Sequence, residues 1–141
     1  MVDAHHSVVT TGPGAGNAGP LTRKVLDYEH TMKRLVPGVK APADWAPLAE
    51  FVAVGEFERI GTFLEVQDWQ QYTEMLTRWA SATEEFQTTV RRISESPALV
   101  YFEIEERHFR GGNVNVVNSM TVFAFNSGKI RHLDVYLQQA R

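Results

Sequence analysis

The sequence between residues 98 and 138 constrains the fold more than any other part of the chain. It contains three runs of alternating apolar and polar residues, ALVYFEIEERHFR, NVNVVNSMTVFAF and KIRHLDVYLQ, which are separated by Gly111-Gly112 and by Asn126-Ser127-Gly128. Alternation is typical of a strand with one buried face, and a Gly-Gly pair favours a two-residue hairpin because both turn residues need a positive φ. We therefore predict three consecutive antiparallel strands.

The Gly-Gly turn predicts which residues of the first two strands share a face. Arg110 should lie opposite Asn113 and His108 opposite Asn115, and the same pairing continues back along both strands. One face is then apolar at one end and becomes polar toward the turn, and we interpret it as the core face. It carries Ala98, Val100, Phe102, Ile104, Glu106 and His108 beside Asn115, Val117, Ser119, Thr121, Phe123 and Phe125.

The second turn decides which side chains of the third strand face the core. A two-residue loop would place Asp134 on the core face, whereas a three-residue loop with Gly128 in a left-handed bulge would place Leu133 there. A one-residue slip exchanges every side chain between the faces. Burying the apolar set is less costly than burying its polar neighbours. We predict the three-residue turn, with Asp134 outside and with an inward set of Leu133, Val135 and Leu137.

The part of the chain before these strands predicts three helices and two further strands. Helices are expected from Thr22 to Val36, from Asp44 over DWAPLAEFV, and after Asp68, where aromatic and aliphatic residues recur at helical spacing. Strands are expected over GEFERIGTFLEV, with a bend at Gly61, and from Glu85 to Ser94. The fold class is therefore α+β. Residues 1–20 are rich in Gly and Pro and predict a flexible leader, and residues 21–141 predict one domain.

Composition excludes several classes of function. The net charge of −3 argues against nucleic-acid binding, which favours a basic surface. No apolar run is long enough to cross a bilayer, so no membrane partner is expected. The absence of cysteine excludes disulfides, thiolate catalysis and cysteine-ligated metals, and it is compatible with a cytoplasmic location, which we expect.

The order of these elements resembles a known superfamily. Helices, a strand and a long meander, with Phe123-Ala124-Phe125 followed by Gly128-Lys129-Ile130, are similar to the nuclear-transport-factor-2-like proteins. These include SnoaL-like polyketide cyclases, ketosteroid isomerase, limonene epoxide hydrolase and scytalone dehydratase. The resemblance covers residues 21–141 and implies a cystatin-like cone, in which three helices pack on a strongly curved, mostly antiparallel sheet around an internal pocket. It also implies a homodimer through the outer sheet face.

The same resemblance relates individual residues to two catalytic sets. Tyr28 looks like the tyrosine that ketosteroid isomerases use as an oxyanion donor, but the position of their second donor is Thr121 here. The position of their general base is Arg59 or Ile60, with Glu58 nearby. The chain also departs from limonene epoxide hydrolases, because the position of their final aspartate falls on an apolar residue of the last strand. Neither set is reproduced in full.

Four residues are candidate catalytic groups: Tyr28, Glu58, Glu106 and His108. A carboxylate in an apolar pocket can act as a general acid or base, and histidine titrates near neutrality. Glu106 or Glu58 would move a proton, His108 would assist, and Tyr28 would polarise an oxygen. The structural alternatives are a solvated sheet rim for Glu106 and His108 and a core position for Tyr28. Glu58 is a base only if it faces inward. The predicted substrate-binding residues are Phe102, Ile104, Val117, Ser119, Thr121, Phe123, Leu133, Val135 and Leu137.

The resulting hypothesis is an isomerase, cyclase, dehydratase or hydrolase that needs no cofactor or metal and acts on a small apolar molecule. Polyketide-, terpenoid- or steroid-like substrates fit this description. The alternative is a non-catalytic ligand-binding or dimerising protein of the same fold. His132 and Asp134 could form a dyad on a tight second turn, but in the predicted register they belong to the outer face. The expected dimer surface consists of Tyr101, Met120, Val122, His132, Asp134 and Tyr136.

Overall fold

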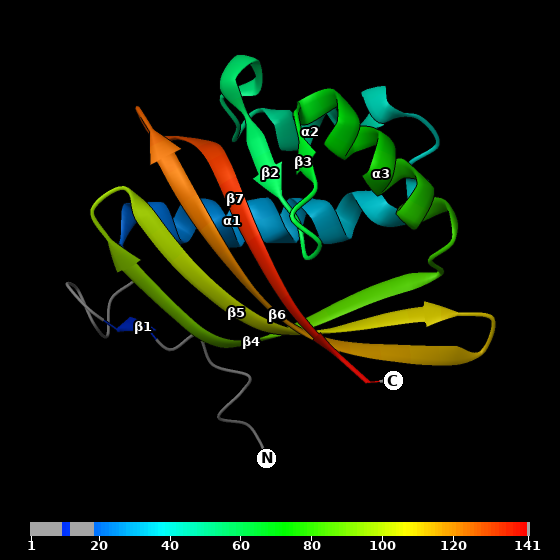
Figure 1. Ribbon diagram of the computed structural model, residues 1–141. Coiled ribbons are helices and arrows are strands. Elements are labelled where there is room, and N and C mark those ends of the chain that lie inside the picture. The colour runs from blue at the N-terminus through cyan, green and yellow to red at the C-terminus, as the bar shows by residue number, and fades with distance from the viewer. Residues whose placement is uncertain (1–9, 12–18, 141) are drawn as a thin grey trace.

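The computed structural model describes residues 10–11 and 19–140, which form one seven-stranded sheet with its helices on one side (Figure 1). The strand order is β1-β4-β5-β6-β7-β2-β3. β1 is parallel to β4 and β2 is parallel to β7, and the other pairs are antiparallel. The α+β fold class is confirmed. The helices and strands are β1 (Thr10–Thr11), α1 (Pro20–Leu35), α2 (Ala46–Ala49), β2 (Glu58–Ile60), β3 (Val66–Gln67), α3 (Trp69–Ser81), β4 (Glu85–Ser96), β5 (Leu99–Arg110), β6 (Asn113–Asn126) and β7 (Lys129–Gln139).

The hairpin between β5 and β6 forms in the predicted register. Arg110 pairs with Asn113 and His108 with Asn115, and the pairing continues without a shift to the end of β5. Gly111 and Gly112 have φ values of 56° and 80°, the left-handed conformation that only glycine adopts without strain. The predicted core face of these two strands is therefore correct from Val100 onward. Ala98 was wrongly included: it lies in the turn before β5, with a φ of 66°, and is exposed.

The turn between β6 and β7 differs from the prediction, although the predicted facing is correct. Ser127 and Gly128 form a two-residue turn with φ values of 51° and 78°, so the predicted three-residue loop is wrong. The register then shifts, because Phe125 pairs with Ile130 but Ala124 pairs with His132. Arg131 is the extra residue of a β-bulge. The bulge restores the facing that the apolar residues require, and it places Leu133 opposite Phe123 and Asp134 on the other face.

The first and third helices agree with the prediction apart from one boundary. α1 begins at Pro20, two residues before the expected cap, and the backbone N–H and side-chain hydroxyl of Thr22 donate instead to Glu95. Asp68 caps α3 as predicted: it accepts a hydrogen bond from the backbone of Gln71, whose side chain accepts one in return.

Two predicted elements are shorter than expected. The second helix is a 3₁₀ turn (Pro42–Trp45) followed by the four residues of α2, because the chain after it pairs with β7: the carbonyl of Phe51 and the N–H of Ala53 both bond to Ile130. The predicted strand over residues 55–66 is a 3₁₀ turn (Val54–Glu56) and then the short strand β2, which turns back at Gly61 to pair with β3. One further 3₁₀ turn, Val36–Gly38, follows α1.

Most of the expected leader, residues 1–9 and 12–18, lies outside the described residues. Thr10 and Thr11 pair with Ile93 and Ser94 of β4. No described helix is both long enough and apolar enough to cross a bilayer.

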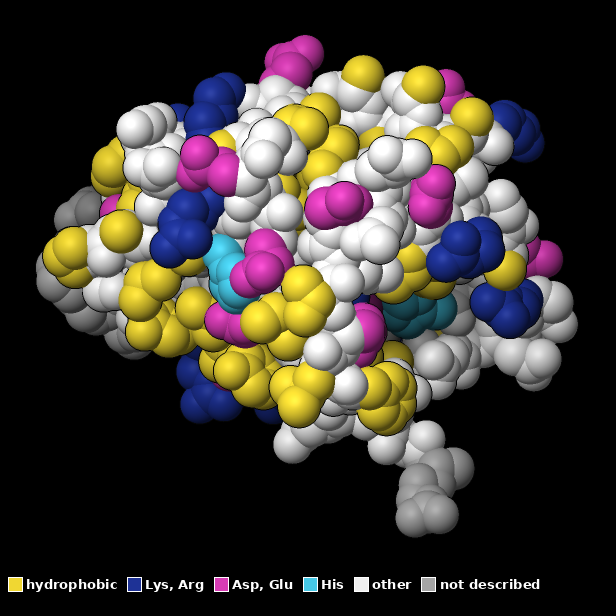
Figure 2. Space-filling view, turned by 45° about the horizontal axis from the view of Figure 1, so that its top comes forward, with side chains coloured by type: hydrophobic (Ala, Val, Ile, Leu, Met, Phe, Trp, Pro, Cys, Tyr) yellow, Lys and Arg dark blue, Asp and Glu magenta, His cyan; other side chains and the backbone are white. Residues whose placement is uncertain are grey.

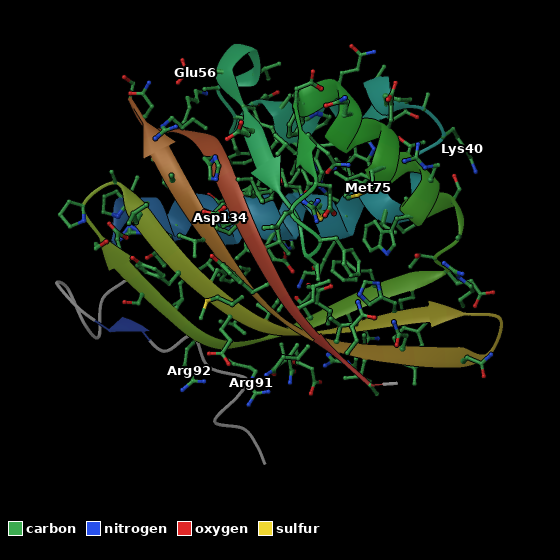
Figure 3. All side chains as sticks on the ribbon, viewed as in Figure 1. Lys40, Glu56, Met75, Arg91, Arg92 and Asp134 are labelled. Carbon is green, nitrogen blue, oxygen red and sulfur yellow. The ribbon has the colours of Figure 1, made fainter. Side chains whose placement is uncertain are left out.

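The hydrophobic core lies between the helices and the concave side of the sheet (Figure 1). Figure 3 shows Met75 of α3 in this layer, whereas Arg91 and Arg92 project from β4 on the side away from the helices. The side chains at its centre are fully buried. They include Val25, Trp45, Leu48, Val100, Ile130 and Leu133. Beside this core, the same face of the sheet forms part of the wall of a cavity.

Candidate active site

A cavity of about 250 Å³, here called the inner cavity, lies between α1, α3, β2 and the concave face of the sheet. Most of its wall is apolar, and the polar groups are few. Its lining residues are Tyr28, Glu29, Met32, Arg59, Tyr72, Met75, Leu76, Trp79, Phe86, Phe102, Ile104, Glu106, His108, Thr121, Phe123, Leu133, Val135 and Leu137. A mostly apolar hollow with a small number of converging polar groups is typical of a small-molecule site.

A chain of hydrogen bonds holds Glu106 in this cavity. The indole N–H of Trp79 donates to Nδ1 of His108 at 3.0 Å. Nε2 of His108 lies 2.8 Å from one carboxylate oxygen of Glu106, and the hydroxyl of Ser119 donates to the other oxygen at 2.6 Å. The side chains of His108 and Glu106 are 20% and 18% exposed, so they lie neither in the core nor on a fully solvated rim.

These hydrogen bonds determine which ring nitrogen of His108 carries the hydrogen. An indole nitrogen only donates, so Nδ1 of His108 must be the acceptor and Nε2 must carry the hydrogen that points to Glu106. His108 can bind a second proton only by losing the hydrogen bond from Trp79. In this arrangement Nε2 of His108 donates to the Glu106 carboxylate and holds its orientation.

A second polar group consists of two tyrosines and an arginine. The Tyr28 hydroxyl lies 3.5 Å from the Tyr72 hydroxyl, to which it donates, and the Arg59 guanidinium lies 5.3 Å from the centre of the Tyr72 ring. Burial raises the pKa of both tyrosines, well above the ordinary value for Tyr28, so both hydroxyls stay protonated at neutral pH. Among the described residues the Tyr72 hydroxyl hydrogen has no acceptor, which leaves it available to a ligand oxygen.

Glu29 is a buried acidic residue of α1 that the sequence analysis missed. Its side chain lines the inner cavity, and burial raises its pKa to about 7, an effect increased by the charge of Glu106 and opposed by a hydrogen bond from Thr88 and by the charge of Lys33. A signal existed in the sequence, because Glu29 follows Val25 by one helical turn and so interrupts an apolar stripe.

The inner cavity adjoins a larger groove at its polar end. This hairpin groove, of about 520 Å³, is formed by the end of α3 and the β5–β6 hairpin. Trp79, Glu106, His108 and Leu137 line both hollows, so Glu106 lies where they meet.

The structure brings most of the predicted site residues together. Val117 lines the hairpin groove, and Ser119 lines neither hollow but holds Glu106. The predicted residues that line the inner cavity are Tyr28, Glu106, His108, Phe102, Ile104, Thr121, Phe123, Leu133, Val135 and Leu137.

Glu58 does not belong to this group, because the inward position that its catalytic role required is not the one it occupies. Its side chain is 52% exposed and lies 3.2 Å from Nδ1 of His132 on the outer face. Arg59, the next residue along β2, faces inward instead. His132 and Asp134 form the pair that the sequence allowed, at 3.0 Å, but on the outside of the sheet. Figure 3 shows Asp134 on β7.

Within residues 10–11 and 19–140, no cluster of three or more His, Asp or Glu side chains is arranged to hold a metal ion.

Comparison with known proteins identifies the fold. No protein-family model and no curated protein sequence matches the chain. Among solved structures, an NTF2-like protein from Anabaena variabilis superimposes with a TM-score of 0.70 and 12% identity over 86% of this chain and 91% of that one. The chain has the nuclear-transport-factor-2-like fold. An LEH-like epoxide hydrolase from M. tuberculosis gives a TM-score of 0.67 and 14% identity over 84% and 83% of the two chains. A SnoaL-like protein from Shewanella putrefaciens gives 0.68 and 10% over 86% and 82%.

The fold that the resemblance implied is therefore confirmed. The superpositions establish the nuclear-transport-factor-2-like architecture. Identities of 10–14% do not establish a shared function. The chemistry has to be inferred from the side chains of this chain.

Proposed function

We propose that the protein is an enzyme that uses acid/base chemistry, without a cofactor, to isomerise, cyclise, dehydrate or hydrolyse a small and largely apolar molecule. The observation that carries this proposal is the position of Glu106. Its carboxylate is held by two donors at the polar end of an otherwise apolar cavity, whose wall also contains the free hydroxyl hydrogen of Tyr72.

The geometry supports proton transfer next to a carbonyl group. Both oxygens of Glu106 keep a lone pair after accepting from His108 and Ser119, so the carboxylate can remove a hydrogen from a substrate carbon. The electrons of that C–H bond would move to the carbonyl oxygen, where the Tyr72 hydroxyl and the Arg59 guanidinium stabilise the negative charge. Return of the proton from Glu106 to another carbon gives an isomer. Transfer of that proton to a hydroxyl group that leaves from the next carbon releases water and gives dehydration.

The lining of the cavity supports a small apolar substrate. A volume of about 250 Å³ is below the ~300–1,000 Å³ typical of ligand sites, which favours molecules of one or two rings. An epoxide hydrolase among the proteins of similar structure shows that this fold can carry small-molecule chemistry.

The test is a panel of one- and two-ring ketones, hydroxyketones and epoxides, screened by thermal shift and then incubated with the protein in deuterated water. We expect at least one bound ketone to exchange the hydrogens next to its carbonyl for deuterium, because proton removal by Glu106 is reversible. The rate, followed by NMR, should fall with the Glu106→Gln variant. Binding without exchange or conversion of any compound would favour the alternative, a non-catalytic ligand-binding protein.

We also propose that the protein forms a homodimer through the outer face of the sheet. The side chains of Tyr101 and Tyr136 are 38% and 61% exposed there. On the face shown in Figure 2, hydrophobic side chains lie among acidic groups and histidine, a mixture that suits a partly polar interface.

The solution mass tests this interface. We expect wild-type protein to have twice the chain mass of 15.9 kDa, and the double variant Tyr101→Glu/Tyr136→Glu to have the mass of one chain, because each dimer would bury four new charges. Light scattering gives both masses. Phe63→Glu is the matched control, because Phe63 is 89% exposed but lies in the β2–β3 turn. A wild-type mass of 15.9 kDa would contradict the proposal.

A further inference from the structure

Glu29 forms part of the wall between two hollows. On one side is the inner cavity, and on the other is a helix groove of about 490 Å³ between α1 and β4. The Glu29 side chain is only 8% exposed although it borders both. The helix groove is lined by Leu26, Asp27, Glu29, His30, Lys33, Thr88, Thr89 and Val90.

One oxygen of this carboxyl group lacks a hydrogen-bond partner. Thr88 donates to the Glu29 carboxyl group, but Oε2 is the one buried side-chain oxygen or nitrogen without a partner in the described part of the chain. Leaving such an atom unpaired is unfavourable, and more so if it is charged, so nearly all buried polar atoms in folded proteins are paired. The natural partner is therefore a group that enters the cavity from outside.

We propose that the unpaired oxygen of Glu29 accepts a hydrogen bond from a hydroxyl group of the bound molecule. The inner cavity would then select a one- or two-ring apolar molecule that carries an alcohol, phenol or enol hydrogen. This inference names the ligand class of the site used in the proposed function and rests on that site.

The charges around Glu29 favour a neutral donor over an ion. The wall of the inner cavity contains charged side chains of both signs, Arg59 and Glu106, so it is not built to neutralise an ion of either sign. A hydroxyl group carries no net charge and supplies the one hydrogen that Oε2 needs. The ionisable groups facing Glu29 are Tyr28 and Lys33 from α1, Tyr72 from α3, Arg59 from β2 and Glu106 from β5, and Asp27 and His30 also line the helix groove.

The affinity for a hydroxyl ligand should depend on pH. The pKa of Glu29 is about 7, so the group is mainly neutral at pH 5.5 and mainly ionised at pH 8. An ionised acceptor makes the stronger hydrogen bond. Affinity for a hydroxyl ligand should therefore rise with pH, whereas a methyl ether of the same shape has no hydrogen to donate and should gain nothing.

The experiment compares 2-naphthol with 2-methoxynaphthalene, and 4-methylphenol with 4-methylanisole to cover a one-ring fit. Dissociation constants are measured by ligand-observed NMR at pH 5.5 and pH 8 for wild type, Glu29→Gln and Asp27→Asn. We expect wild type at pH 8 to bind at least one hydroxyl compound about tenfold tighter than its ether, as one charge-assisted hydrogen bond implies. The preference should fall below threefold at pH 5.5 and in Glu29→Gln. Asp27→Asn, on the same helix but outside the cavity, should keep it.

A second readout is independent of the variants. In wild type labelled with ¹³C at its glutamate carboxyl carbons, the hydroxyl compound should lower the titration midpoint of Glu29, because it binds the ionised form, and its ether should not.

The outcomes separate this inference from the proposed function. Equal affinities within each pair, a preference unchanged in Glu29→Gln, or no binding of any of the four compounds would overturn the assignment of Glu29. If deuterium exchange of a ketone persists in those cases, the proposed function stands without it. A hydroxyl preference that depends on Glu29, with no exchange in any compound, would support the assignment and overturn the catalytic proposal.

Discussion

The Glu106→Gln variant should lower turnover by roughly 10²–10⁴-fold, the usual contribution of a positioned acid or base, while changing ligand affinity only a few-fold. Glutamine has nearly the same shape, and its amide oxygen can still accept a hydrogen bond from His108 or Ser119, so the cavity keeps its form. The amide cannot take up a proton at neutral pH. Steady-state kinetics and the deuterium exchange rate measure the loss, and the dissociation constant of an unreactive analogue measures binding.

Glu105→Gln is the control for this experiment. Glu105 is the preceding residue of β5, and its substitution by glutamine removes the same charge. It lies on the opposite face of the sheet, where it pairs with Arg107. Its turnover should stay within about twofold of wild type, because exposed charges contribute little at a distance. Full activity in Glu106→Gln would remove Glu106 from the mechanism.

The Glu29→Gln variant should be more stable than wild type at pH 8, by about 3 kcal/mol. The pKa of Glu29 is about 7 in the folded protein and 4.5 ordinarily, because burial disfavours its charged form. A raised pKa means that its favourable contribution is complete below pH 4.5 and is lost as the pH rises through 7. The difference between a pKa of 4.5 and one of about 7 lowers the free energy of unfolding by roughly 3 kcal/mol once the pH is above 7. Glutamine cannot ionise and avoids this loss.

Urea denaturation between pH 4 and pH 8.5 measures the effect. The free energy of unfolding of wild type should fall, relative to that of Glu29→Gln, from about pH 4.5 to about pH 7 and then stay level. Asp27→Asn, at an exposed position two residues earlier on the same helix, should follow wild type to within about 0.5 kcal/mol. If the free energies of unfolding of wild type and Glu29→Gln changed with pH in parallel, the pKa of Glu29 would not be raised in the folded protein.

The sheet could be predicted from sequence because its determinants are local. Two glycines with positive φ define the β5–β6 hairpin, and strict alternation then places every side chain of both strands. The facing of β7 was also predictable, since burying Leu133 costs much less than burying Asp134. The sequence did not predict how β7 reaches this facing, because a bulge at Arg131 and a longer turn place Leu133 on the same side.

The polar side of the cavity depends on contacts between segments that are distant in the sequence. The sequence alone did not predict which polar side chains meet there. β2 has only three residues, too few for alternation to distinguish Glu58 from Arg59, and its neighbour β7 decides the outcome. The hydrogen bond that fixes His108 comes from Trp79, 29 positions earlier, on a helix that the sequence assigned to the core. Glu29 was overlooked because a single acidic residue in an apolar stripe is commonly exposed by a small rotation of the helix.

The bulge at Arg131 determines which side chains of β7 face the cavity. If the bulge were lost while Arg131 stayed in the strand and the Ser127-Gly128 turn stayed in place, the register after Ile130 would slip by one residue: Asp134 would face the cavity, and Leu133 would move to the outer face. A second carboxylate would then stand across from Thr121. A change of register at this one point, with no change in chain length, would therefore exchange a hydrocarbon surface of the cavity for an acidic one on the same scaffold.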